Sequence, residues 1–317
     1  MPSVHCFNIP RKRKNRERAV KKITFTEIKI FIIVGFFGWV KNIMSDVDDT
    51  KIKPRKTPVE LVHGKKVKST KMLFFKSKSV TIKMLFNKDD LTNGLYILKK
   101  GEIVPKHYND YDKAFYVYKG KVDLFVKGAK KTLVKGDSVY IPKGSVTELS
   151  QKGSQVSQVY FFYPEGPLKS IKHYDGGSLT KASDRDGNNV RVIFSKDVPW
   201  ENWDGKIKDG KITPLAWKTL IENKSMILGI TKIDPGYDVD SHYHRQTQVV
   251  IFERGQGETH IKDGQYVPVG VESVIYPPTY STHHTKNTGK EALWEIYFFN
   301  SGPFSSIKYH FDKKKKP

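Results

Sequence analysis

The chain of 317 residues contains an internal repeat, and this repeat limits the folds open to it more than any other feature. The segment Val159–Pro167 (VYFFYPEGP) returns as Ile296–Pro303 (IYFFNSGP), and two residues after each copy comes Ser-Ile-Lys. Three further positions recur 135 residues later: Gly101, His107 and Gly120 return as Gly236, His242 and Gly255. Unrelated strands would not keep one offset over so many turn residues, so we predict two copies of one unit.

Short runs of alternating polarity fill each copy, for example Val122–Val126 and Thr259–Ile261. Glycine, proline, asparagine and aspartate separate these runs, and long helical periodicity is scarce. Alternation with a period of two is typical of half-buried antiparallel strands. We therefore predict an all-β fold of two barrels in tandem, rather than a parallel sheet with crossover helices.

The repeat also predicts how the chain divides into domains. Residues 1–43 form a basic and apolar leader that lies outside the repeat, and its removal from the mature protein is left open as an alternative. Residues 44–174 form the first barrel, residues 175–190 are a linker rich in glycine and aspartate, and residues 191–317 form the second barrel.

The leader places eight basic residues between positions 11 and 22, ahead of the apolar run Ile30–Val40. This run has eleven residues, which is too short to cross a bilayer by itself. The order of basic and then apolar residues is similar to a signal peptide or a weak anchor, yet no small-x-small cleavage site follows. Translation from Met44 is an equal alternative. We expect a cytoplasmic protein without firm membrane attachment, with anchoring or export through residues 11–40 left open.

The net charge of +23 raises the question of a nucleic-acid partner. Lysines spread along both halves, and they far outnumber arginines outside the leader, whereas phosphate recognition concentrates arginine in patches. We predict no specific nucleic-acid partner and expect a small-molecule substrate instead, with a homodimer left open. The single cysteine, Cys6, permits no disulfide within the chain and no cysteine-based metal site in the barrels.

The chemistry-bearing residues gather in the second copy. His242, His244 and Gln248 have the same parity, so they share one face if the strand stays regular. His283 adds a third imidazole from a distant strand, and His284 is its alternative. Neutral imidazoles suit late first-row divalent metals, and an amide oxygen is a weak fourth ligand.

These residues resemble the two sequence motifs of the cupin superfamily. The segment Gly236–Gly255 matches motif one, G-x5-H-x-H-x3-E-x6-G, except that Gln248 replaces the glutamate. In motif two, Tyr280 replaces a glycine, and the matching residues are Pro278, His283 and Asn287. The resemblance implies a bicupin of double-stranded β-helix barrels, with a metal between the His-x-His strand and the later histidine. The ligand set that it implies is His242, His244, Gln248 and His283.

The departure at Gln248 removes the one anionic ligand that the family usually supplies. Neutral ligands leave a divalent ion its full charge, which favours an anionic or enolisable oxygen substrate. We expect one divalent transition metal, which is Fe, Mn, Ni, Zn or Cu, and a metalloenzyme that acts on a small anionic or carbonyl-bearing metabolite. No second carboxylate in the pocket is evident from the sequence, so a general base is missing and a dioxygenase is slightly favoured. A metal-assisted isomerase, cyclase or lyase of sugar acids is one alternative, and a non-catalytic ligand-binding barrel is another. The catalytic residues stay unassigned.

The first copy keeps His107 but has Asn109, Lys113 and Thr147 at the other three ligand positions. One imidazole beside a cation does not make a metal site. We therefore predict that the first barrel has lost its metal and supports the second barrel structurally. Lys113 is expected to be solvated, with the anchoring of an acidic ligand as its alternative.

Overall fold

The computed structural model describes residues 5–6, 53–74, 78–175, 189–202, 214–262 and 264–311. Nearly all of the leader and residues 176–188 of the predicted linker lie outside the described residues. The predictions on the start of translation, on cleavage and on anchoring therefore fall outside them as well. Among the described helices, none is long and apolar enough to span a membrane.

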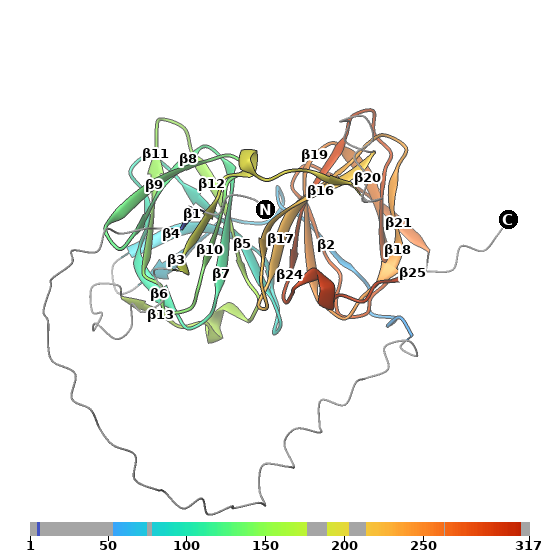
Figure 1. The fold of residues 1–317 in the computed structure, drawn as a ribbon, viewed down its shortest axis with the longest axis horizontal. Coiled ribbons are helices and arrows are strands. Elements are labelled where there is room, and N and C mark those ends of the chain that lie inside the picture. Colours follow the sequence, from blue (N-terminus) through green and yellow to red (C-terminus); the bar gives the residue numbers. More distant parts are fainter. Residues whose placement is uncertain are drawn as a thin grey trace, which may run out of the picture. The chain divides into compact units, whose positions relative to one another are not determined.

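Two antiparallel sheets form the first barrel, drawn mainly in green in Figure 1. The larger sheet has the order β1 (His5–Cys6), β14 (Arg191–Ile193), β10 (Ser138–Ile141), β7 (Lys113–Lys119), β12 (Ser157–Tyr163), β5 (Thr92–Leu98), β4 (Lys78–Asn87) and β3 (Thr70–Phe74). The smaller sheet has the order β13 (His173–Asp175), β6 (Ile103–Asn109), β11 (Thr147–Lys152), β8 (Lys121–Val126) and β9 (Ala129–Val134).

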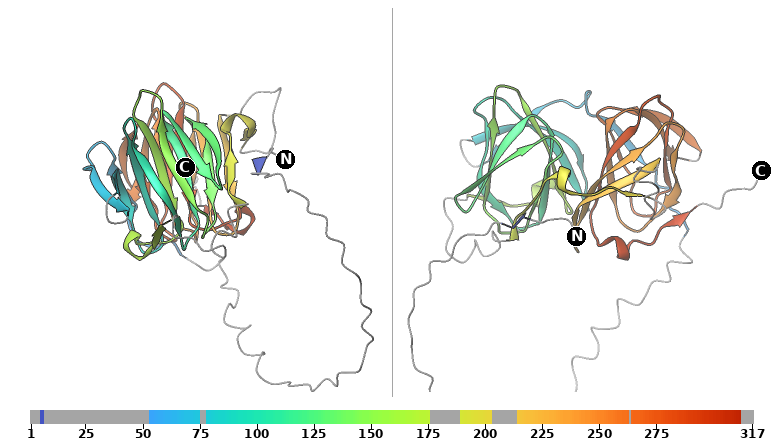
Figure 2. Two further views of the ribbon diagram at one scale, coloured as in Figure 1. Left: turned by 90° about the vertical axis from the view of Figure 1, so that its left-hand side faces the viewer. Right: turned by 45° about the horizontal axis from the view of Figure 1, so that its top comes forward.

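The second barrel repeats this arrangement, as the orange and red strands show in Figure 2. Its larger sheet has the order β2 (Glu60–His63), β22 (Ser273–Tyr276), β19 (Gln248–Arg254), β24 (Leu293–Phe299), β17 (Ile227–Ile233), β16 (Leu215–Glu222) and β15 (Glu201–Asn202). Its smaller sheet has the order β25 (His310–Phe311), β18 (Asp238–Tyr243), β23 (His283–Asn287), β20 (Gln256–Lys262) and β21 (Gln265–Gly270). In the described residues, short 3-10 helices are η2 (Leu168–Ser170), η4 (Ser195–Asp197) and η5 (Phe304–Ser306). The all-β prediction of two equivalent barrels is confirmed.

The first strand of each copy pairs with the barrel of the other copy. Strand β2 lies beside β22 of the second barrel, with Leu61 opposite Ile275. Strand β14 lies beside β10 of the first barrel, with Val192 opposite Val139. Each exchanged strand covers a sheet edge that would otherwise present unpaired N–H and C=O groups. The predicted domain boundaries mark where each copy of the repeat begins and ends in the sequence. The hydrogen-bonded sheets do not follow these boundaries, because β2 and β14 each pair with a strand of the other copy.

The repeated run of apolar residues is explained by burial on both faces of one strand. In β12, Phe161 and Tyr163 belong to the core of the first barrel. The alternate residues Tyr160 and Phe162 belong to a second apolar cluster that includes Phe298 of β24. Phe162 and Phe298 stack with ring centroids 4.9 Å apart. Because both faces of the strand are buried, its sequence is apolar throughout rather than alternating.

We expect Phe298→Ala to lower the free energy of unfolding by about 3–5 kcal/mol, because it leaves a cavity in the apolar cluster shared by the two copies. Denaturant unfolding monitored by tryptophan fluorescence measures the change. Tyr237→Ala is the control, since Tyr237 is 51% exposed and its removal should change stability by less than about 0.5 kcal/mol. A loss below about 1 kcal/mol for Phe298→Ala would contradict the shared core.

Candidate functional site

The structure brings together the three histidines that the motifs single out. His242 on β18 lies directly opposite His283 on β23, and His244 follows β18. The His283 ring centroid lies 4.3 Å from that of His242 and 4.9 Å from that of His244. All three side chains are buried, and their potential ligand atoms lie within 4.8 Å of one another. Among the described residues, these three histidines are the one group of three or more His, Cys, Asp or Glu side chains that could hold a metal ion.

Each of these imidazoles is oriented by a backbone carbonyl at its Nδ1 atom. The acceptors for His242, His244 and His283 are the carbonyl oxygens of Asp240 at 2.6 Å, Gln246 at 2.8 Å and Ser281 at 2.9 Å. With Nδ1–H donating, every Nε2 atom presents a lone pair to the shared space.

The donor set fits a divalent transition ion. Nε2 of His244, Nε2 of His283 and Oε1 of Gln248 are buried, and they have no hydrogen-bond partner among the described residues. Buried acceptors without a donor are uncommon and call for an explanation. Neutral imidazoles with an amide oxygen are ligands that late first-row divalent metals accept.

Burial keeps the imidazoles of His244 and His283 neutral. Burial, reinforced by the charge that His242 would carry, lowers the pKa of His244 to about 3. Burial, together with the charges that His242 and His244 would carry, holds the pKa of His283 well below its usual value. Both rings are therefore unprotonated near neutral pH, so an ion would displace no proton from them.

The alternation of side chains along each strand directs Gln248 toward the cavity and His284 away from the histidine cluster. Gln248 is 8% exposed and lines the same cavity as His242. His284 points to the other face of β23, where its Nε2 lies 2.8 Å from Oδ2 of Asp238 and its Nδ1 lies 2.8 Å from the Tyr266 hydroxyl. The alternation of the strand thus separates His284 from the cluster and leaves His283 in it.

Tyr280 holds the backbone conformation that the motif-two glycine normally supplies. Its φ is +60°, and Gly144 at the same point of the first copy has φ of +75°. A side chain in this left-handed region costs roughly 1 kcal/mol. The Tyr280 N–H donates to the His244 carbonyl oxygen at 2.7 Å, which ties this turn to the histidine cluster.

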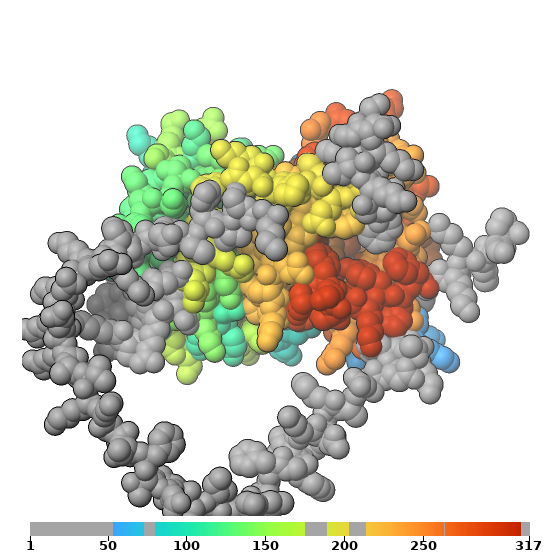
Figure 3. Space-filling view, in the orientation of Figure 1, coloured from blue at the N-terminus to red at the C-terminus, as the bar shows by residue number. Residues whose placement is uncertain are grey.

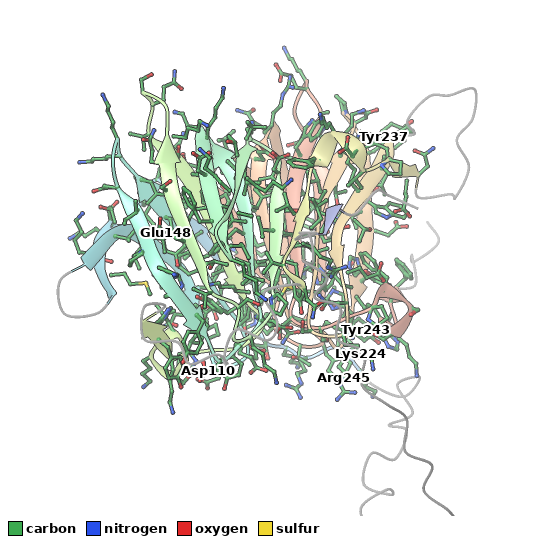
Figure 4. All side chains as sticks on the ribbon, turned by 60° about the vertical axis from the view of Figure 1, so that its left-hand side comes forward. Asp110, Glu148, Lys224, Tyr237, Tyr243 and Arg245 are labelled. Atoms are coloured by element: carbon green, nitrogen blue, oxygen red, sulfur yellow. The ribbon has the colours of Figure 1, made fainter. Side chains whose placement is uncertain are left out.

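In Figure 4, Tyr243 and Arg245 lie at the lower end of the second barrel, while Tyr237 lies at its upper end. Asp110, which is the residue of the first copy that corresponds to Arg245, lies at the lower end of the first barrel. The motif-one turns of the two copies thus lie at the same end in this view. Arg245 is exposed.

A cavity of about 450 Å³ adjoins His242 and Gln248. Aromatic and apolar side chains line most of it, including Trp217, Tyr297 and Phe299. The segment after β24, red in Figure 3, covers part of this barrel, and its residues Phe304, Ile307 and Tyr309 also line the cavity. The barrel interior is therefore not filled by its own side chains.

Glu295 corrects the expectation that the pocket holds no second carboxyl group. It lines the cavity from β24, is 5% exposed, and its Oε1 has no hydrogen-bond partner among the described residues. Burial raises the pKa of Glu295 to about 8, and a hydrogen bond with Thr285 partly opposes this shift. The signal in the sequence is weak, because one acidic residue within LWEIYFF can equally lie on the solvent face.

Lys113 corrects the expectation of a solvated lysine. It is 1% exposed, and its Nζ lies 2.9 Å from Nε2 of His107 and donates to Oδ1 of Asn109 at 2.7 Å. The His107 Nδ1 atom donates to the Pro105 carbonyl oxygen at 2.6 Å, as its counterpart His242 does with Asp240. The amine of Lys113 thus satisfies the Nε2 acceptor of His107.

Comparisons with known proteins agree with this architecture. The profile of the cupin domain matches residues 94–163. An uncharacterised protein of Aquifex aeolicus is 40% identical over 57 residues, which is 18% of this chain and 46% of that relative.

Solved structures of Bacillus subtilis oxalate decarboxylase are similar in fold. One, determined at pH 4.6, has a TM-score of 0.54 at 13% identity over 76% of each chain. Another, from work on its Mn(II) centres, has a TM-score of 0.54 at 13% identity over 79% of this chain and 78% of that one. Residues 94–163 therefore match the cupin domain, and the chain has the same two-barrel fold as these solved structures.

We expect Lys113 to make stability depend on pH. Burial lowers the pKa of Lys113 from 10.5 to about 7, so between these values the unfolded chain holds a proton that the folded chain lacks. The free energy of unfolding should therefore rise with pH across this window, by up to about 1.4 kcal/mol per pH unit from this group.

Urea unfolding at several pH values tests this dependence. Lys113→Met should remove the slope that Lys113 contributes, whereas Lys121→Met, at an exposed position of the same barrel, should keep it. Identical slopes in the two variants would show that Lys113 is not buried with a lowered pKa.

Proposed function

We propose that the protein is a metal-dependent cupin enzyme that acts on a small carbonyl-bearing or anionic metabolite. Its second barrel would hold one divalent transition ion through His242, His244 and His283, with Gln248 as a weaker fourth ligand. The observation that most supports this proposal is that three buried acceptor atoms without a partner among the described residues lie together beside an open cavity. These atoms are Nε2 of His244, Nε2 of His283 and Oε1 of Gln248. A bound ion would supply Lewis acidity toward substrate oxygens. A purely structural barrel would instead be filled by side chains.

The cavity favours a dioxygenase over an isomerase or lyase. Proton-transfer chemistry needs acid and base groups within hydrogen-bond reach of the reacting carbon. Among the described residues that line the cavity, Glu295 is the one buried carboxyl group, and it hydrogen-bonds with Thr285, which is two residues from His283 on β23. Two residues correspond to roughly 7 Å along the strand, so the backbone position of the Thr285 partner lies beyond direct hydrogen-bond reach of that of His283. An oxygen-uptake screen of metal-loaded protein with small oxo-acids and hydroxy-ketones tests the assignment.

A second candidate follows from the neutral ligand set. Without a carboxylate ligand, the site keeps the full charge of a divalent ion and would suit a small dianion such as oxalate, the substrate named for the structural neighbours. The aromatic lining around Trp217 and Phe299 argues for a substrate with a larger apolar body. Carbon dioxide release from oxalate by metal-loaded protein would favour this second candidate.

We expect purified protein to contain about one divalent metal ion per chain. His242→Ala should lose most of it, because a ligand is removed, and His107→Ala should retain it, because Lys113 already occupies the corresponding space in the first barrel. Elemental analysis measures the stoichiometry. Two ions per chain, or equal loss in both variants, would overturn the assignment to the second barrel.

We expect Gln248→Glu to bind the ion at least about tenfold more tightly, since a carboxylate adds an anionic ligand worth more than about 1.4 kcal/mol. The same change should weaken an anionic probe such as oxalate by lowering the charge of the site. Gln248→Ala should cost less metal affinity than His242→Ala, because an amide oxygen is the poorer ligand.

Competition with a chelating dye measures these affinities. The exposed Gln265→Glu adds the same charge away from the cluster and serves as the control. If Gln248→Glu and Gln265→Glu behave alike, the side chain of Gln248 does not face the ion.

A further inference from the structure

We propose that Glu295 is a second recognition point for the substrate, at the end of the cavity away from the histidines. As a neutral carboxyl group it donates a hydrogen bond to an oxygen at the far end of a flat, largely apolar substrate. The inference rests on the proposed function, because it takes the histidine cluster as the other end of the site. It adds the substrate class: paired oxygens at one end, an apolar body, and a hydrogen-bond acceptor at the other end.

The strand register places Glu295 far from the metal ligands but in the same cavity. Gln248 lies opposite Phe299, whereas Phe252 lies opposite Glu295, so Glu295 is four residues further along the pair β19 and β24. Its hydrogen bond with Thr285 lies two residues from His283 on the facing sheet. These rises along the two strands separate the backbone positions at this end of the cavity from those at the histidine end by roughly 7 to 13 Å.

The surroundings of Glu295 make it a hydrogen-bond donor. The side chain is 5% exposed, and its Oε1 is buried without a partner among the described residues. A carboxylate in such a place loses its hydration, so the neutral form is favoured and carries an O–H group. The raised pKa of about 8 agrees with this. A substrate that brings negative oxygens to the histidine end would cancel the charge of a bound ion there, so the acid stays neutral in the loaded site.

The cavity walls define the body of the substrate. Trp217, Tyr297, Phe299, Phe304 and Tyr309 line a volume of about 450 Å³. Pockets of this size enclose molecules far larger than a two-carbon diacid. Of the three carboxyl groups that line the cavity in the described part of the chain, Glu201 and Glu222 are exposed, so Glu295 is the one that would meet the buried part of a ligand.

Two probes of the same shape test the proposal. 4-Acetylcatechol has adjacent hydroxyl groups at one end and a ketone at the other, and 4-isopropylcatechol lacks the ketone. We expect zinc-loaded wild-type protein to bind the acetyl probe about tenfold more tightly, which is the effect of one good buried hydrogen bond. Glu295→Gln keeps an N–H donor and should retain most of this preference, while Glu295→Leu should abolish it. Glu258→Gln, at an exposed position of β20, is the control and should keep the full preference.

Titration calorimetry measures the affinities, and difference infrared spectroscopy follows the carboxyl group itself. The wild type should show a protonated-carboxyl C=O band that shifts when the acetyl probe binds and that is missing from both Glu295 variants. An equal affinity for the two probes, a preference that survives Glu295→Leu, or binding of neither probe would overturn the proposal. Failure of the proposed function would show separately, as wild-type protein that takes up no zinc, and the infrared band does not depend on that result.

Discussion

The structure depends on how a barrel interior satisfies buried hydrogen-bond acceptors. In both copies an inward histidine, His107 or His242, donates from Nδ1 to a carbonyl oxygen two residues earlier. This bond fixes the ring and turns the lone pair of Nε2 into the barrel, where an unpaired acceptor costs free energy. The first copy satisfies it internally with the amine of Lys113. The second copy gathers two more buried acceptors, His244 and His283, around the same point.

The two barrels are coupled, so this difference does not make the first barrel dispensable. Phe162 and Phe298 are buried against each other in the shared apolar cluster. The segment before β2 also reaches the second barrel, where the Ser281 hydroxyl donates to the Thr57 carbonyl oxygen. Ser281 is the residue whose own carbonyl oxygen orients His283. Residues from the start of the first copy therefore stabilise the turn that positions a candidate metal ligand.

Much of the fold and the histidine cluster follows from local patterns in the sequence. A constant offset between copies predicts equivalent barrels, and strand parity separates His283 from His284. The features that were missed depend on contacts between residues distant in sequence. The burial of Lys113 requires knowing that Asn109 and His107 face it across a closed interior. The exchange of β2 leaves no trace in the repeat, because both copies exchange the same strand.

Glu295 was also missed, and its position changes how the departure at Gln248 is understood. A glutamate at position 248 would place a negative charge beside the histidine cluster, whereas the amide adds no charge there. The buried carboxyl group of this cavity instead lies on β24, remote from the histidines, where loss of hydration keeps it neutral. With an ion bound as proposed, the cavity would have an electron-accepting group at one end and a hydrogen-bond donor at the other. Both ends would then attract electron-rich oxygens, and the aromatic walls between them would disfavour charge in the middle of a substrate. In the proposed site, the Gln-for-Glu difference at position 248 would therefore act together with a distant acid to set the polarity of the whole cavity.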